Sequence, residues 1–143
     1  MTPALEFDPS RRARVLAEAR RRERAQTRFY RHLAAEADLS GESALAERFN
    51  ELHADEQHHL SRITARMLEL ELDPGGGAEE EVQAAPTLEG WLEVAREREK
   101  AEVRWYEEAL SEPLDPETRR VLEEILESER HHRRDVGGKW MPA

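Results

Sequence analysis

Helix-breaking residues are confined to a few short segments of this chain, and the stretches between them are long and strongly periodic. An Asp-Pro pair begins two of these stretches, at Asp8-Pro9 and Asp115-Pro116, where the aspartate can cap a helix and the proline costs no hydrogen bond. Apolar residues recur every three or four positions, as on a helix with one buried face. The sequence therefore predicts four helices, over residues 9–37, 42–72, 88–111 and 116–136.

The connections between these helices are short, long and short. Residues 38–41 and the segment around Pro113 contain the turn-forming residues typical of tight connections. About fifteen residues separate the second and third helices, beginning with a Pro-Gly-Gly-Gly run after Asp73, and this length can carry the chain from one end of a bundle to the other. We therefore expect an all-α fold with a single domain over residues 1–143, a four-helix bundle of two helix hairpins joined by a long crossover connection.

Composition narrows the classes of function. The chain contains no cysteine, which excludes disulfides, thiol nucleophiles, zinc ribbons and Cys-ligated iron–sulfur sites within it. Its formal net charge of −10 argues against nonspecific nucleic-acid binding, and no apolar run approaches the length of a membrane span. The first ten residues lack the apolar core of a secretory signal. We therefore expect a cytoplasmic protein that binds neither nucleic acid nor membrane.

Glutamates occupy four positions at which the helical period calls for Leu or Ile. They belong to one pattern that occurs twice, because the first and third helices carry a glutamate seven residues before a tyrosine, and the second and fourth carry Glu-x-x-His. The members of this pattern are Glu23 and Tyr30, Glu56 and His59, Glu99 and Tyr106, and Glu129 and His132. A glutamate and a histidine three residues apart share one helix face, so both can reach one point. The sequence therefore predicts an internal repeat of helix hairpins.

The inward glutamates predict a metal centre. Four unpaired carboxylates inside one bundle would repel each other and resist ionisation, and no arginine shares their helical phase. Two divalent cations would offset this charge. Four carboxylates and two imidazoles suit Fe(II) or Mn(II) and also accept Zn(II). The alternative is a metal-free bundle with polar core positions. The expected ligands are Glu23, Glu56, His59, Glu99, Glu129 and His132.

Three further side chains are candidates for a catalytic role beside this centre. Glu102 lies one turn after Glu99 and points roughly inward, whereas the equivalent residue of the first half is Gln26. Glu102 is therefore either an exposed glutamate or a seventh, switchable ligand. Tyr30 and Tyr106 are either simple core aromatics or hydrogen-bond donors to carboxylates of the site.

The remaining histidines fit the pattern less well. His58 and His131 lie about 100° around their helices from the expected ligands, which places them at the surface or beside the site. Asp55 and His58 form a rival Asp-x-x-His pair, which we reject because the second half has no counterpart. His53 is expected beside the ligands or as a polar core residue, and His32 at the surface.

Taken together, these motifs resemble the ferritin-like di-iron carboxylate proteins. The tyrosine seven residues after each lone glutamate and the segment ALAERFNELHADEQHH look most like the rubrerythrin branch. The resemblance extends from about Asp8 to Val136 and includes all six expected ligand positions. It implies a ferritin-like bundle, two bound iron ions that pass electrons to hydrogen peroxide or dioxygen, and a homodimer that can exchange helix hairpins between its subunits.

The absence of cysteine departs from typical rubrerythrins, which carry a Cys-ligated rubredoxin domain that supplies electrons to the irons. Turnover by this chain would therefore require an external electron donor protein. The expected function is a di-iron oxidoreductase of the peroxidase type. The alternatives are a non-enzymatic iron-binding or sequestration module and a ferroxidase-like protein, for which Fe(II) is itself the substrate.

Overall fold

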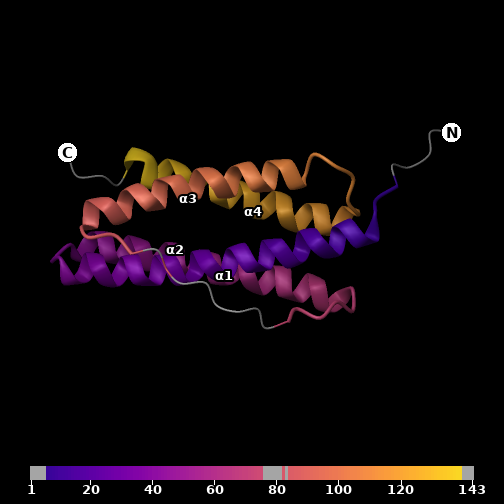
Figure 1. Ribbon diagram of the computed structural model, residues 1–143, viewed down its shortest axis with the longest axis horizontal. Coiled ribbons are helices and arrows are strands. Elements are labelled where there is room, and N and C mark those ends of the chain that lie inside the picture. The colour runs from indigo at the N-terminus through magenta and orange to yellow at the C-terminus, as the bar shows by residue number, and fades with distance from the viewer. Residues whose placement is uncertain (1–5, 76–81, 83, 140–143) are drawn as a thin grey trace.

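Four long α-helices form the protein in the computed structural model, which describes residues 6–75, 82 and 84–139 (Figure 1). They are α1 (Pro9–Leu39), α2 (Ser43–Glu69), α3 (Leu88–Ala109) and α4 (Pro116–Arg134), and a short π-helical turn, η1 (Asp135–Lys139), follows α4. The predicted all-α four-helix bundle is confirmed. Within the described ranges, every helix is too short or too polar to serve as a transmembrane span.

The helix ends differ by a few residues from their predicted positions. The helix expected over 42–72 ends at Glu69, because Glu71 adopts a left-handed backbone conformation with φ of 59°. The helix expected over 116–136 changes to a π-helical turn after Arg134. In addition, α1 continues two residues beyond 37, and α3 stops two residues short of 111. Apolar periodicity runs past these points, so it does not reveal where the backbone hydrogen bonding changes.

The Asp-Pro pairs at Asp8-Pro9 and Asp115-Pro116 begin helices in the structure, as predicted. The Asp8 carboxylate accepts the backbone N–H of Ser10 at 2.9 Å, and the Asp115 carboxylate accepts the backbone N–H of Thr118 at 3.1 Å. Each contact satisfies a donor that the first turn of a helix leaves unpaired, which is worth about 1 kcal/mol. The two caps therefore define the first turns of α1 and α4.

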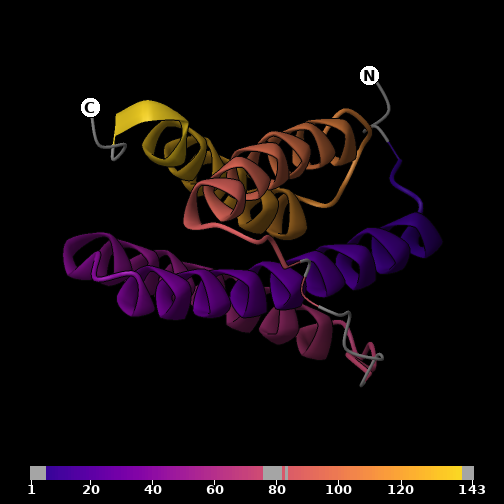
Figure 2. The same ribbon diagram turned by 60° about the vertical axis from the view of Figure 1, so that its left-hand side comes forward.

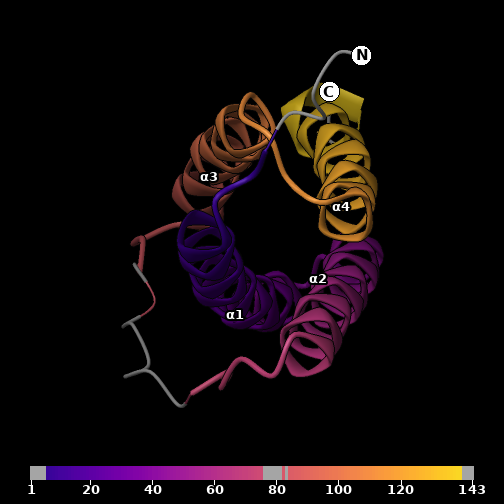
Figure 3. The same ribbon diagram turned by 90° about the vertical axis from the view of Figure 1, so that its right-hand side faces the viewer.

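The two helix hairpins pack face to face. Viewed along the bundle, α1 lies beside α3 and α2 lies beside α4, so the four helices enclose one interior (Figure 3). Figure 2 shows the hairpins as two layers, with α1 and α2 in one and α3 and α4 in the other. Because α2 ends at one end of the bundle and α3 begins at the opposite end (Figure 1), the long connection is a crossover.

The interior contains two apolar clusters with a polar layer between them. One cluster includes Phe29, Phe49 and Trp91, and the other includes Ile63 and Leu122. Burial of each such side chain stabilises the fold by about 1.5–3 kcal/mol. Along α1, α2 and α3, a buried glutamate lies between the segment that contributes to one cluster and the segment that contributes to the other. Glu129 of α4 likewise lies between the α4 residues of one cluster and Val136 of η1 in the other. The fold therefore places four glutamates at one level of the bundle, shielded at both ends.

A polar network ties three helices together at one end of the bundle. Asp115, at the start of α4, accepts hydrogen bonds from Arg12 of α1 at 3.1 Å and from Arg66 of α2 at 2.7 Å. Burial alone would raise the pKa of the Asp115 carboxyl, but the hydrogen bonds from Thr118, Arg12 and Arg66 outweigh burial and hold this pKa at about 2. The Asp115 carboxylate is thus both a helix cap and an ion-pair partner.

Candidate metal centre

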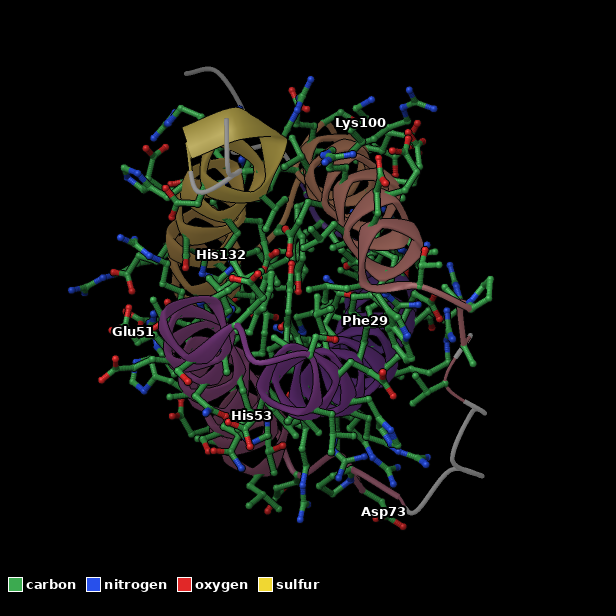
Figure 4. The ribbon with its side chains drawn as sticks, turned by 90° about the vertical axis from the view of Figure 1, so that its left-hand side faces the viewer. Phe29, Glu51, His53, Asp73, Lys100 and His132 are labelled. Atoms are coloured by element: carbon green, nitrogen blue, oxygen red, sulfur yellow. The ribbon has the colours of Figure 1, made fainter. Side chains whose placement is uncertain are left out.

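The polar layer brings together all six residues that the sequence predicts as ligands. Each of the four glutamates is fully buried, and the two histidines are almost so. Every helix contributes, and His132 lies between α4 and α2 (Figure 4). We call this set the metal centre: Glu23 of α1, Glu56 and His59 of α2, Glu99 of α3, and Glu129 and His132 of α4.

The metal centre divides into two groups of potential ligands, within each of which one ligand atom per residue lies within 4.8 Å of the others. Glu56 and Glu129 belong to both groups, so each can bridge two ions. Glu23 and His59 complete one group, and Glu99 and His132 complete the other. Each group therefore holds one terminal glutamate and one histidine, and the two halves of the chain supply equivalent residues.

The histidine nitrogens and carboxylate oxygens of the centre face one another at ligand-like positions. His59 Nδ1 lies 3.2 Å from Glu129 Oε1 and 3.5 Å from Glu23 Oε2, and His132 Nδ1 lies 2.9 Å from Glu56 Oε1. None of these contacts has hydrogen-bond geometry. Among the described residues, the following buried atoms of the centre have no hydrogen-bond partner: Glu23 Oε2, both Oε of Glu56, His59 Nδ1, Glu99 Oε2, both Oε of Glu129 and His132 Nδ1.

These unpartnered atoms fit a pair of divalent cations. Buried polar groups without partners are costly, and carboxylates crowded at one point are more so. The ligand set is mixed oxygen and nitrogen, as first-row divalent metals prefer. Two cations would satisfy every one of these atoms at once, whereas hydrogen bonds inside the centre satisfy none of them. The residues present therefore fit a dinuclear metal site.

The crowding of buried carboxylates in the centre also shifts the pKa values of its residues. Burial, together with the neighbouring carboxylates, raises the pKa values of Glu23 and Glu56, and that of Glu99 well above its ordinary value. Burial alone would lower the pKa of His59, but the surrounding carboxylates raise it to about 12. The charge of a bound metal would replace the protons that these groups otherwise hold.

Two tyrosines reach the centre from the opposite hairpin. Tyr106 of α3 donates its hydroxyl to Glu23 Oε1 at 2.7 Å, and Tyr30 of α1 donates its hydroxyl to Glu99 Oε1. Both tyrosines are fully buried. Burial and the adjacent carboxylates raise both tyrosine pKa values well above 10, so the hydroxyls remain donors. In each glutamate, Oε1 is thus occupied by a tyrosine while Oε2 is left for a metal.

Glu102 is buried, and it belongs to neither ligand group. The alternative of an exposed glutamate is therefore wrong. Its Oε1 pairs with Arg22 of α1 at 3.1 Å, and its Oε2 has no hydrogen-bond partner among the described residues. Burial raises the pKa of Glu102 to about 7, although the charge of Arg22 acts in the opposite direction. Arg22 lies outside the core phase of α1, but its long side chain reaches the buried carboxyl.

Arg98 and Gln26 form the pair that is equivalent, in the internal repeat, to Arg22 and Glu102. Arg98 precedes Glu99 as Arg22 precedes Glu23, and its Nε donates to Gln26 Oε1 at 2.5 Å. Gln26 in turn donates from Nε2 to Glu99 Oε1 at 3.2 Å. Apolar periodicity does not reveal either arginine as a neighbour of the centre. A comparison of segments 22–30 and 98–106, RERAQTRFY and REKAEVRWY, contains the signal, because the two are alike over their whole length.

Asp55 is a second feature that sequence analysis missed. It lies on α2, where the rejected Asp-x-x-His pair suggested only a partner for His58, yet its Oδ2 lies 3.0 Å from Nε2 of His132. The hydrogen bond to His132 lowers the pKa of the Asp55 carboxyl. Because a carboxylate can only accept, Nε2 of His132 carries a proton in this contact, which leaves Nδ1 as the nitrogen that can bind a metal.

The other histidines stay outside the centre. His58, His131 and His32 are exposed. His53 is half-buried, and its Nδ1 contacts the carbonyl oxygen of Thr27 at 2.9 Å, which makes it a link between α2 and α1. The ligands are therefore drawn from one face of each helix.

A four-helix bundle with two carboxylate and histidine metal sites at its middle defines a ferritin-like protein of the di-iron carboxylate type. The family model for rubrerythrin matches residues 14–136. The chain therefore belongs to the rubrerythrin family.

Comparison with solved structures agrees with this fold. Bacterioferritin BfrA of Mycobacterium tuberculosis matches with a TM-score of 0.85 at 22 % identity, over 95 % of this chain and 87 % of that one. A mycobacterial bacterioferritin matches with a TM-score of 0.84 at 24 % identity, over 93 % of this chain and 84 % of that one. At these identities the likeness concerns the fold. No curated protein sequence shows a significant match to this chain.

Proposed function

We propose that this protein binds two iron ions and uses them to reduce hydrogen peroxide, or dioxygen, with electrons from an external donor protein. The observation that supports this function best is the set of unpartnered nitrogen and oxygen atoms that converge on two adjacent points. Glu56 and Glu129 would hold both ions, Glu23 and His59 one of them, and Glu99 and His132 the other. When bound, two Fe(II) ions supply two electrons and open coordination positions for the oxidant.

The surrounding residues hold this ligand set in place. Tyr30 and Tyr106 fix the terminal glutamates through one oxygen each, and Asp55 fixes the ring of His132. The apolar clusters on both sides exclude water from the polar layer. Such preorganisation keeps the ligands in one geometry while the charge of the centre changes.

Glu102 is the residue that we propose for proton transfer. Reduction of one hydrogen peroxide to two waters consumes two electrons and two protons. A carboxyl with a pKa of about 7 exchanges its proton readily at neutral pH, and Glu102 Oε2 has no other partner among the described residues. Released from Arg22, the same carboxylate could also act as the switchable seventh ligand that the sequence suggests.

The electron donor and the assembly follow from the same reasoning. The chain has no cysteine with which to hold an electron-transfer iron site, so we propose that a separate redox protein delivers electrons. We also propose a cytoplasmic homodimer, in which the crossover between α2 and α3 would permit exchange of helix hairpins between subunits.

Metal content and oxidation kinetics test the function together. Protein purified without added metal should contain two iron ions per chain. Anaerobically reduced protein, mixed in a stopped-flow instrument, should be oxidised by hydrogen peroxide much faster than by air. Equal rates with both oxidants would contradict the peroxide reductase. Binding of many irons per chain, or oxidation of many Fe(II) equivalents, would favour sequestration or a ferroxidase.

A further inference from the structure

The two halves of the chain surround the metal centre with the same four-part arrangement. In one set, Arg22 of α1 lies over the ring of Trp105 of α3, Trp105 packs against Tyr106, and Tyr106 bonds to Glu23 of α1. The equivalent set, with the two helices exchanged, is Arg98, Phe29, Tyr30 and Glu99. Each set crosses between α1 and α3, and Figure 4 shows Phe29 at this boundary. The arrangement thus follows the internal repeat.

The two sets differ in the aromatic residue that packs against the tyrosine on the side away from the metal centre. Trp105 occupies this place in one set and Phe29 in the other. The rings of Trp105 and Tyr106 are 4.9 Å apart between centroids and nearly perpendicular, whereas those of Phe29 and Tyr30 are 5.6 Å apart. Indole and phenol lose one electron far more readily than a benzene ring does. Only the first set therefore consists of groups that can carry a single electron.

The two outer rings also differ in exposure. Trp105 is half-buried and reaches the surface beside Arg22, but Phe29 is only 1 % exposed and is covered by the buried Trp91 at 5.6 Å. The path from solvent to a ligand of the centre is thus short on one side: one ring contact and one hydrogen bond of 2.7 Å. On the other side a phenylalanine interrupts the path.

We infer that Trp105 and Tyr106 form a one-electron route between the protein surface and the metal centre. This inference rests on the proposed function, because an electron route is useful only if the centre is redox-active. It assigns Trp105 a role that its position at the edge of an apolar cluster does not require.

Reduction of dioxygen to water takes four electrons, two more than a pair of bound Fe(II) ions would supply, and the route delivers the missing electrons one at a time. Tyr106 is then oxidised: one electron passes to the centre, and the phenolic proton moves to Glu23 Oε1 along the existing hydrogen bond. Trp105 reduces the Tyr106 radical in a reversible step that favours the tyrosyl radical, and the proton returns from Glu23 to the phenol as removal of the Trp105 radical at the surface pulls the step forward. A one-electron reductant at the surface, such as a reduced redox protein, finally restores Trp105. Electrons and protons balance over the cycle.

Transient absorption of the zinc-loaded protein tests this route without any turnover. Zinc is redox-inert, so it can neither supply nor accept the electron. A photosensitiser is attached at Glu108→Cys, an exposed position one turn after Trp105, and the absence of native cysteines makes the label unique. After a flash with an added electron acceptor, we expect a tryptophan radical that decays into a tyrosyl radical.

Variants of the labelled protein assign the two radicals. Trp105→Phe introduces the residue that the repeat itself carries at position 29, and it should lower the yield of tyrosyl radical at least tenfold. Tyr106→Phe should abolish the tyrosyl radical and prolong the tryptophan radical. Tyr30→Phe is the matched control for the only other tyrosine, and Trp140→Phe controls for a tryptophan outside the described residues. Trp140→Phe should behave as the parent protein, and Tyr30→Phe, compared at full zinc loading because it loses a bond to Glu99, should keep the tyrosyl radical.

Two outcomes would overturn the inference. One is a full tyrosyl yield in Trp105→Phe, and the other is a tyrosyl radical that disappears with Tyr30→Phe instead of Tyr106→Phe. Zinc content and circular dichroism of each variant establish that it is folded and loaded. Because the assay uses neither iron nor peroxide, absence of radical transfer would contradict this inference without contradicting the proposed function. Loss of peroxide reactivity in the iron protein would likewise leave the measured radical transfer intact.

Discussion

Asp55 on α2 accepts a hydrogen bond across 3.0 Å from Nε2 of His132 on α4, and so it links the two hairpins directly at the metal centre. More than half of the Asp55 side chain is exposed, but the histidine that it contacts is buried. The second half of the chain has Ser128 at the equivalent position. The two metal sites are therefore supported unequally.

This inequality predicts a selective effect of Asp55→Ala. Removal of the carboxylate frees the His132 ring to rotate and to move its proton, which should weaken metal binding by about 10- to 100-fold at the site that includes His132. Zinc titration against a competing chelator should then show one weakened and one normal site. His58→Ala, an exposed neighbour, is the control and should change neither. Equal weakening of both sites would contradict the assignment.

The shared glutamates should differ from the terminal ones in metal stoichiometry. Glu56 and Glu129 belong to both ligand groups, whereas Glu23 and Glu99 belong to one each. We expect Glu56→Ala and Glu129→Ala to lose both metals, and Glu23→Ala and Glu99→Ala to keep one. Metal content per chain, measured after dialysis, checks this. If Glu56→Ala and Glu129→Ala both retain two metals, the dinuclear assignment is wrong.

Arg22 should set the pH at which Glu102 loses its proton. Arg22 lowers the pKa of Glu102 from the higher value that burial alone would produce, and the result is about 7. Replacement of Arg22 by Gln should therefore raise the pKa of Glu102 and shift the pH profile of peroxide reduction upward. The carboxyl resonance of labelled Glu102 in NMR gives the same pKa without turnover.

Arg98→Gln is the matched control for this measurement. Arg98 occupies the equivalent position but bonds to Gln26, which carries no ionisable proton. We expect the pH profile of this variant to follow that of the parent protein. A downward shift in Arg22→Gln, or an equal shift in both variants, would show that the Arg22–Glu102 pair does not control proton transfer.

Asp115 should contribute to stability above about pH 4 and lose that contribution in acid. An unfolded aspartate has a pKa of about 3.9, and the folded value is lowered to about 2. Because the unfolded state binds the proton more tightly, the free energy of unfolding should fall as the pH drops from about 4 to 2, by at most about 2 kcal/mol. Urea denaturation of the metal-free protein at several pH values measures this dependence.

Asp115→Asn should flatten this acid dependence. Asparagine still caps α4, but it cannot form ion pairs with Arg12 and Arg66. The variant should thus be less stable than the parent at neutral pH and approach it near pH 2. Glu117→Gln, an exposed substitution in the same helical turn, is the control. An unchanged acid dependence in Asp115→Asn would show that other carboxyls dominate.

The sequence by itself determined the bundle and the set of buried glutamates and histidines. Asp-Pro pairs and apolar periodicity are local signals, and they place the helices to within a few residues. The glutamates were identifiable because each replaces an apolar residue in a core phase, and the internal repeat related one half to the other. These features depend only on spacing along single helices, which the sequence states directly.

Only the tertiary structure decided which side chains meet across helices. Asp55 is exposed and out of phase with the core, so nothing local connects it with His132, which is 77 residues away. Arg22 and Arg98 also lie at the edge between the buried and exposed faces of their helices. The side chains that they can contact depend on the distance between α1 and α3. Periodicity specifies the direction in which a side chain leaves its own helix, but the partner it finds depends on how the hairpins pack. The burial of the six predicted ligands on one face of each helix was therefore predictable, whereas the residues that contact them from other helices were not.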